Sequence, residues 1–242
     1  MTASYSAART DAHVGESDSL NAAQLLAEVE RLRPLAEMGR MAATVAHEIR
    51  NPLAGISANA ELLREAVPSG PDSESVDIIL AEVDRLGHLV TDLLYYSRER
   101  EPDLRPIDLP WLARTTCELS QVEAERAGVE LVWSGRGRAI GDTELSRQAL
   151  LNVIRNAVQA CREGGRVALM IVDGCITVQD TGCGVPEILR ERLFEPFITG
   201  RTRGLGLGAT VARRCQRRQR GELALIDTGP SGSSFALNWP MN

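Results

Sequence analysis

The sequence predicts an α-helical hairpin followed by a two-layer α/β sandwich, and three observations support this fold class. Apolar residues recur every three or four positions through much of the first hundred residues, which is the period of amphipathic helices. Short alternating strands and further helices then share the second half of the chain. Three prolines within 101–110 separate the two patterns and indicate a linker between two domains.

Composition and charge exclude several classes of protein. A chain of 242 residues has room for one or two domains, and its net charge of -6 disfavours nucleic acid as a partner, because nucleic acid binds basic surfaces. No apolar run approaches the roughly 18 residues of a membrane span, and the polar start lacks the apolar centre of a signal peptide. We therefore expect a cytoplasmic protein with no direct membrane span and no nucleic-acid partner.

The cysteines and the basic residues limit which metal, disulfide and phosphate-binding sites the chain can form. The five cysteines are an odd number without a CxxC pair, which indicates reduced thiols rather than a disulfide or zinc framework. Every basic side chain is an arginine, since the sequence contains no lysine. Any phosphate contact is therefore expected from arginine or from the backbone.

The first domain is predicted over 20–100, after a tail at 1–19 that has too few apolar residues to order itself. Its first long helix carries one apolar stripe at steps of three or four residues. The stripe consists of Met38, Ala42, Val45, Ile49, Leu53, Ile56, Ala60 and Leu63. A turn over 67–72 follows, with Asp72 or Ser73 available to cap the next helix.

The second helix has the spacing of a coiled-coil seam, with steps that alternate between three and four residues. Its seam residues are Val76, Ile79, Val83, Leu86, Val90, Leu93 and Ser97. A single hairpin leaves such a seam uncovered, whereas two hairpins from two chains close it as a dimeric four-helix bundle. We therefore predict a homodimer. The alternative is that the hairpin packs on the rest of its own chain.

The second domain is expected over 111–242 and mixes strands with helices, as a two-layer α/β sandwich requires. Its helices are predicted within 142–165 and 212–221. Its strands are predicted at 129–135, 221–229 and 233–240, with a hairpin over 166–180 that turns at Asp173 and Gly174.

The stretch HEIRN, which begins at His47, is the first candidate for chemistry. It resembles half of the zinc motif HExxH, but Asn51 replaces the second histidine, which disfavours zinc. At about 100° per residue, His47 is rotated roughly 200° from both Val45 and Ile49, so it points away from the apolar stripe. An exposed imidazole beside Glu48 can act as a nucleophile while the carboxylate takes up its proton.

Asn152 and Asn156 form the second candidate, because a spacing of four places both amides on one helix face. Amide oxygens suit a hard cation such as Mg²⁺. The alternative is that the two amides cap a neighbouring loop.

Asp180, Gly182 and Gly184 form the third candidate, within QDTGCGVP. Glycines let the backbone approach a flat ligand closely, while a carboxylate at the end of a strand accepts a hydrogen bond from an exocyclic amine. A simple Asp-Gly turn is the alternative.

Gly204, Gly206 and Gly208 form the fourth candidate and lead into a predicted helix. Free N–H groups and the helix dipole at such a helix start favour an anion. The spacing is not the dinucleotide fingerprint, and no βαβ unit precedes it, so a Rossmann site is excluded. The preceding stretch LFEPFITG, at 193–200, has the composition of a mobile lid.

The order of these four motifs resembles that of the histidine kinases of two-component signalling, over about residues 35–240. Within that family, LLNVIRNAVQA and the short lid FITGR are most similar to the nitrogen-regulation type. The resemblance implies a dimerisation and histidine phosphotransfer hairpin at 20–100 and a linker at 101–110. At 111–242 it implies a catalytic ATP-binding domain of the gyrase, Hsp90, kinase and MutL fold.

The resemblance also implies a role for each matching residue. His47 matches the phosphoacceptor, Glu48 the neighbouring general base, and Asn51 the amide that orients the reaction. Asn156 matches the Mg²⁺ ligand, and Arg201 matches a basic lid residue near the γ-phosphate. The implied ATP contacts are Asn152 on the phosphate side, Asn156, Asp180 at the adenine, Gly182, Gly184, Thr199, Gly204, Gly206 and Gly208.

The implied function is that of an ATP-dependent protein histidine kinase with ATP and Mg²⁺ as cofactors. It autophosphorylates His47 and passes the phosphoryl group to an aspartate in the receiver domain of a response regulator, and a separate sensor protein is one source of its stimulus. Two alternatives stay open: a phosphatase-dominant enzyme, or a nucleotide-binding scaffold with little autokinase activity. Ala209 and Leu205 depart from the leucine and threonine that are usual in the family, which bears on ATP affinity.

Overall fold

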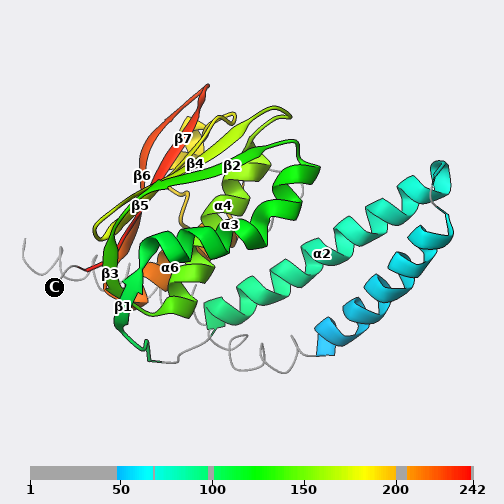
Figure 1. Cartoon of the computed structure of the whole chain (residues 1–242), viewed down its shortest axis with the longest axis horizontal. Helices are drawn as coiled ribbons and strands as arrows, with labels where there is room; N and C mark the ends of the chain where they lie inside the picture. Colours follow the sequence, from blue (N-terminus) through cyan, green and yellow to red (C-terminus); the bar gives the residue numbers. More distant parts are fainter. Residues whose placement is uncertain (1–47, 68, 98–100, 200–205, 241–242) are drawn as a thin grey trace, which may run out of the picture.

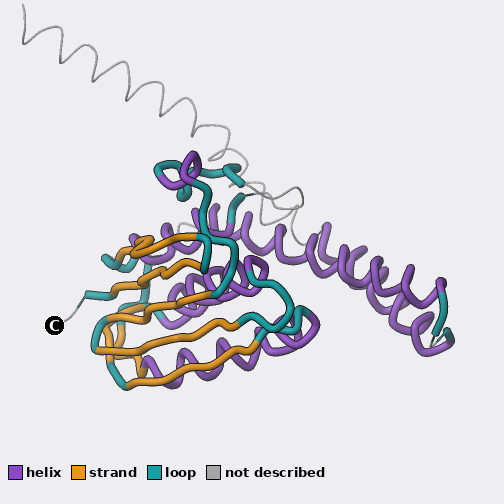
Figure 2. Tube along the Cα trace, turned by 90° about the horizontal axis from the view of Figure 1, so that it is seen from above, coloured by secondary structure: helices purple, strands orange, loops and turns teal. Residues whose placement is uncertain are grey.

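The structure is a computed structural model of the chain and describes residues 48–67, 69–97, 101–199 and 206–240. Figure 1 shows two parts, a pair of long helices and an α/β domain. The turn between the long helices points away from the α/β domain in Figures 1 and 2, while the far end of the second helix lies beside that domain. The predicted tail and the first three residues of the apolar stripe lie outside the described residues.

The hairpin consists of a helix that is described over 48–66 and of α2, Pro71–Ser97. Helix α2 begins at Pro71, so the caps expected at Asp72 and Ser73 lie inside its first turn instead. Proline suits this position because its fixed φ is helical and its missing N–H would have no partner within the helix. The cap position is residue 70, so the expectation of a capping side chain at Asp72 or Ser73 was wrong by two or three positions.

The apolar seam of the hairpin divides into two rows of different burial. Leu53, Ala60, Val76 and Val90 are buried, with both pairs separated by multiples of seven residues. A second row remains exposed and consists of Ile49, Ile56, Leu63, Ile79 and Leu86. The exposed row borders an apolar groove of about 360 Å³. One row is thus buried in the structure, while the other leaves an apolar face open.

The α/β domain contains a five-stranded sheet in the order β2-β4-β5-β7-β6. Strands β2 and β4 are parallel, and every other neighbouring pair is antiparallel. The predicted hairpin is confirmed, since β4 and β5 pair on either side of the turn at Asp173 and Gly174. The strands are β2 Glu130–Gly135, β4 Arg166–Val172, β5 Cys175–Asp180, β6 Glu222–Gly229 and β7 Gly232–Asn238.

Three helices form the second layer, on one face of the sheet (Figure 1). They are α3 Leu109–Arg126, α4 Thr143–Ala160 and α6 Gly208–Arg218, and a short helix α5, Glu187–Arg190, lies apart in the loop after β5. The main core lies between these layers, where Leu150 and Ile154 of α4 share a cluster of buried residues with Leu169 and Ile176 of the sheet. Across the part of the chain that the structure describes, every helix is too short or too polar to cross a membrane.

The expected linker at 101–110 is shorter in the structure. β1, Arg105–Asp108, pairs with β3, Arg138–Gly141, as a separate two-stranded sheet, and α3 follows β1 directly. Pro106 is tolerated because each strand of a two-stranded sheet is an edge, and Pro110 lies in the first turn of α3, where Asp108 caps the helix. Only 101–104 lack regular structure in this stretch.

Candidate functional site

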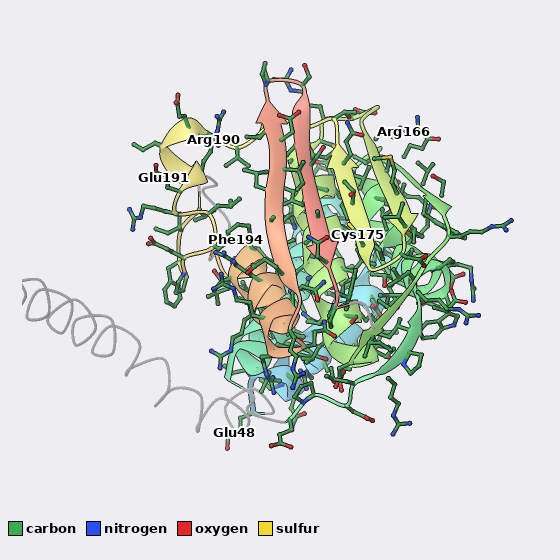
Figure 3. All side chains as sticks on the ribbon, turned by 90° about the vertical axis from the view of Figure 1, so that its left-hand side faces the viewer. Glu48, Arg166, Cys175, Arg190, Glu191 and Phe194 are labelled. Carbon is green, nitrogen blue, oxygen red and sulfur yellow. The ribbon has the colours of Figure 1, made fainter. Side chains whose placement is uncertain are left out.

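The hairpin presents two of its three predicted site residues in the described part of the chain. Glu48 and Asn51 are exposed on the first helix, which continues through Pro52, and Figure 3 labels Glu48. His47 immediately precedes the described residues. A carboxylate and an amide are therefore available on the surface beside it.

The two asparagines of α4 face the start of α6. Asn152 is buried, with 2% of its surface exposed, and Asn156 is half-buried. A Cβ atom built on Gly208 would lie 3.4 Å from the side-chain Oδ1 and Nδ2 of Asn156 and 3.5 Å from Oδ1 of Asn152. The side chains of Asn152 and Asn156 therefore both lie close to Gly208. Their amide oxygens are suitable ligands for a hard cation such as Mg²⁺.

Asp180 is held by backbone donors from two segments. Its Oδ1 accepts hydrogen bonds from the Gly182 N–H at 2.8 Å and from the Ser233 N–H at 3.3 Å, and only 4% of its surface is exposed. Gly182 packs on α4, because a Cβ atom there would lie 2.6 Å from the carbonyl oxygen of Ala160. Gly184 has φ +73°, a conformation that favours glycine. The Asp180 carboxylate is thus held in a fixed position at the start of the loop that contains Gly182 and Gly184.

Thr228 fastens this loop to the hairpin of β6 and β7. Its hydroxyl accepts a hydrogen bond from the Val185 N–H at 2.8 Å and lies 2.9 Å from the Ser233 hydroxyl. The glycine loop after β5 therefore depends on the last two strands for its position. The sequence reasoning missed Thr228, because Val185 is 43 residues away in the chain and no local pattern marks the contact.

The glycines before α6 form a tight turn into an uncapped helix. Gly206 has φ +67°, and a Cβ atom there would lie 2.4 Å from the carbonyl oxygen of Ile198. Helix α6 begins at Gly208 without a side-chain cap. The first N–H groups of a helix have no acceptor within it, so this end can bind an anion. Gly204 and Arg201 lie outside the described residues.

The predicted lid is anchored at one of its two aromatic residues. Phe194 packs against the core, and the Arg213 guanidinium of α6 lies 4.6 Å from the centre of its ring. Figure 3 shows Phe194 on the segment beside α6. Phe197 is half-exposed with φ +65°, which is strained for a bulky residue, and Thr199 is exposed.

Helix α4 also contacts Asp92, a further residue that the sequence reasoning missed. Asp92 of α2 is 6% exposed, and its Oδ1 accepts hydrogen bonds from Nδ2 of Asn152 at 3.1 Å and from Nε2 of Gln148 at 3.2 Å. Burial raises the pKa of Asp92, whereas the two amide hydrogen bonds and the charge of Arg155 act in the opposite direction. The end of the hairpin therefore lies directly against one of the candidate site residues.

Two family models match the chain in succession. The His Kinase A (phospho-acceptor) domain matches residues 37–102, and the histidine kinase-, DNA gyrase B- and HSP90-like ATPase matches residues 141–242. The first match includes His47, and the second includes Asn152, Asn156 and Asp180. The two matches fall on the hairpin and on the α/β domain respectively.

Curated proteins that are similar to the chain include three kinases. The signal transduction histidine-protein kinase AtoS of Escherichia coli K12 is 30% identical over 225 residues, which are 90% of this chain and 36% of AtoS. The sensor histidine kinase ZraS of the same strain is 30% identical and is covered to 50%, with 92% of this chain aligned. The histidine kinase/phosphatase NtrB of Rhodobacter capsulatus is 28% identical, with 83% of this chain and 61% of NtrB covered. The chain thus spans between a third and two thirds of their lengths.

Solved structures with a similar fold include ShkA and the histidine kinase ThkA. Full-length ShkA in complex with AMPPNP has a TM-score of 0.63 and 31% identity, and the match covers 83% of this chain and 45% of ShkA. ThkA in complex with the response regulator protein TrrA has a TM-score of 0.58 and 25% identity, and the match covers 89% of this chain and 66% of ThkA. Both matches extend over the hairpin and the α/β domain together.

Proposed function

Because the chain belongs to the two-component histidine kinases, we propose that it transfers the γ-phosphoryl group of ATP to His47 and then to an aspartate of a response regulator. The observation that carries the proposal is the convergence of Asn152, Asn156 and Gly208 at the uncapped start of α6. That arrangement offers amide oxygens and backbone N–H groups together, which is what the phosphates of a nucleotide require. The nitrogen-regulation type is one of several kinds of relative, with NtrB beside AtoS and ZraS.

Asp180 would read the adenine. An ionised carboxylate accepts hydrogen bonds only, so it favours the exocyclic amine of adenine over a carbonyl at the same position. The hydrogen bonds from Gly182 and Ser233 already fix its orientation before a nucleotide binds. Gly182 and Gly184 let the loop pack closely on Ala160 and Gly229, because a Cβ atom at either position would clash with a backbone carbonyl oxygen there.

Asn156 would hold Mg²⁺ through its amide oxygen, with the amide oxygen of Asn152 beside it on the phosphate side of the site. When bound there, Mg²⁺ supplies charge neutralisation on the phosphate oxygens. The N–H groups at the start of α6, Thr199 and Arg201 of the lid, and the glycines at 204 and 206 would complete the phosphate contacts. Positioning and charge neutralisation are the main needs of phosphoryl transfer, and these groups provide both.

In the transfer step, a ring nitrogen of His47 attacks the γ-phosphorus, a nitrogen–phosphorus bond forms, and the bond to the β–γ bridging oxygen breaks with release of ADP. Glu48 takes the proton that the imidazole loses, and Asn51 orients the reaction. The exposed positions of Glu48 and Asn51 support these roles, because both the ATP-binding domain and a regulator must reach the same surface. The phosphoryl group then passes to a regulator aspartate.

We propose a homodimer in which the exposed row of the seam closes a four-helix bundle. Ile49, Ile56, Leu63, Ile79 and Leu86 support this assembly, because each leaves at least 36% of its surface exposed in the single chain. The hairpin at 20–100 would carry dimerisation and phosphotransfer. The ATP-binding domain would begin with β1, a few residues before the expected position 111. The stimulus would come through a separate sensor protein.

Incubation of the purified chain with γ-labelled ATP and Mg²⁺ tests the proposal. We expect acid-labile, base-stable label on the wild-type chain and on His88→Gln, a matched control on α2, and no label on His47→Gln. Label that persists in His47→Gln would contradict the assignment of the phosphoacceptor. Nucleotide binding without label would favour the scaffold, and removal of phosphate from a labelled regulator without autophosphorylation would favour the phosphatase.

A further inference from the structure

Two residues of α2 contact three residues of α4 and so join the hairpin to the ATP-binding domain. Glu144, Gln148 and Asn152 follow one another at steps of four, so they share a helix face. Glu144 accepts a hydrogen bond from the Tyr95 hydroxyl at 2.8 Å, and the two amides donate to Asp92. Asn156 is the next residue on the same helix face. The hairpin therefore contacts the same face of α4 that carries Asn152 and Asn156, the two residues proposed to lie at the phosphates.

The chemistry of Asp92 determines how Asn152 is oriented. An ionised carboxylate has no hydrogen to donate, so any amide bonded to it must present its nitrogen. Nδ2 of Asn152 lies 3.1 Å from Asp92, and Oδ1 consequently faces the other way, 3.5 Å from a Cβ atom built on Gly208. The same argument applies to Gln148, whose Nε2 lies 3.2 Å from the same carboxylate oxygen.

The burial of Asp92 is difficult to explain as a device for stability. Removing a carboxylate from water is unfavourable unless strong partners replace the water. The two hydrogen bonds described for Asp92 come from neutral amides, and the charge of Arg155 offsets the effect of burial only in part, because the pKa of Asp92 remains raised. An apolar residue at this position would pack the end of α2 without that penalty. A polar group retained at such a position indicates a role beyond packing.

We propose that Asp92 is a positioning residue of the nucleotide site, which holds the Asn152 amide with its oxygen toward Gly208 and the bound phosphates. The inference rests on the proposed function, since it assigns the phosphate side of that site to Asn152. The oxygen that remains is the atom that binds a hard cation, and a carboxylate on the nitrogen increases the negative charge of that oxygen. The hairpin thus contributes a residue to a site that otherwise lies within the ATP-binding domain.

Calorimetric titration of the full chain with ADP at graded Mg²⁺ concentrations tests this proposal without requiring catalysis. In Asp92→Asn the side chain can donate as well as accept, so Asn152 is free to reverse. We expect the Mg²⁺ concentration for half-maximal ADP binding to rise about 10-fold, which is the lower end of the effect of removing such a partner. The matched control is Asp84→Asn, on the same helix with 64% of its side chain exposed, for which we expect no change.

Equal Mg²⁺ dependence of Asp92→Asn and the wild type would overturn the proposal. A second measurement does not depend on the variant: in the wild-type chain, the side-chain N–H₂ signals of Asn152, assigned by their loss in Asn152→Ser, should be protected from solvent exchange. Rapid exchange of these hydrogens would also overturn it. If the wild type bound no nucleotide at any Mg²⁺ concentration, the proposed function would fail, while the exchange measurement would still test the hold of Asp92 on Asn152.

Discussion

Asp180 is fixed by the chain before any nucleotide arrives. Two backbone N–H groups share its Oδ1, so an asparagine at this position can keep those bonds through its own oxygen. What it loses is the charged acceptor for the amine of adenine. A hydrogen bond to a charged group contributes about 1.5–3 kcal/mol, so we expect Asp180→Asn to weaken ADP binding roughly 10- to 100-fold with little change in Tm.

Calorimetry with ADP and thermal denaturation check this prediction, and Asp227→Asn on the exposed part of β6 is the matched control. If Asp180→Asn bound ADP as tightly as the wild type does, the Asp180 carboxylate would not be the contact for adenine. A large fall in Tm would instead indicate that its role is structural.

Asp92 makes a separate prediction about stability and pH. Its pKa in the folded chain is raised above the ordinary value of 3.8, with burial as the largest cause. A carboxylic acid with a raised folded pKa destabilises the folded state as pH rises through the interval between the ordinary and the raised pKa. We therefore expect Asp92→Asn to have a higher Tm than the wild type at neutral pH, with a difference that shrinks as the pH falls. A lower Tm for Asp92→Asn at neutral pH would contradict this expectation.

The cysteines differ in burial, and their reactivity should follow. Burial raises the pKa of both Cys117 and Cys215 to about 12, so these thiols stay protonated. Cys183 is exposed between Gly182 and Gly184, beside the proposed adenine contact Asp180. We expect iodoacetamide to modify Cys183 well before Cys117 or Cys215, and ADP to slow the reaction at Cys183, as followed by mass spectrometry. Faster modification of Cys215 would be inconsistent with its burial.

Helix 48–66 and α2 were readable from their periodicity, because apolar steps of three and four persist over many turns. The same pattern could not tell which row would be buried within one hairpin and which would be left open. Ile56 belongs to the open row, with 47% of its surface exposed, and Leu62 lies off the seam with 65% exposed. This difference allows the dimer to be tested with two substitutions of similar chemistry on one helix.

We expect Ile56→Asp to convert the dimer to a monomer, because the substitution places a charge in the apolar interior of a four-helix bundle. Leu62→Asp should stay dimeric. Sedimentation equilibrium measures both masses directly. A wild-type chain that sediments as a monomer, or an Ile56→Asp dimer, would contradict the proposed assembly.

Four elements of the α/β domain were not anticipated, the short helix α5 and three elements that each have a weak local signal. β1 contains Pro106, and β3 is only four residues long and ends at Gly141, so neither looks like a strand on its own. Helix α3 buries small and polar residues such as Thr116 and Ser120 beside its leucines, which blurs the apolar period. The strong patterns of β4, β5 and α4, by contrast, correctly predicted their structure.

In the candidate site, too, some residues are marked by a pattern in the nearby sequence, while others are placed only by contacts between distant segments. The spacing of Asn152 and Asn156 and the glycines around 182 and 206 are local patterns, and the structure places the two asparagines near Gly208 and the end of α4 near Gly182. Asp92 and Thr228 act on those segments from 60 and 43 residues away, respectively. Their contacts exist only after α2 and the last hairpin have packed, so no pattern near either residue marks them.

At the scale of the whole molecule, α4 is the element that joins the hairpin to the nucleotide site. Its first turns form hydrogen bonds with Tyr95 and Asp92 of α2, Asn152 and Asn156 face Gly208, and its last residue packs against Gly182. A nucleotide that contacts α4 is therefore linked through one rigid helix to the hairpin. This arrangement is suited to an enzyme whose ATP and phosphoacceptor lie on different domains.

Mapping the phosphoryl group on the intact wild-type chain, after incubation with Mg²⁺ and ATP at neutral pH, tests the central claim most directly. Tandem mass spectrometry should find one added phosphoryl group on the imidazole of His47 and none on His13 or His88, the remaining histidines of the chain. A phosphoryl group on another residue, or an unmodified chain that nonetheless binds ATP, would contradict the account.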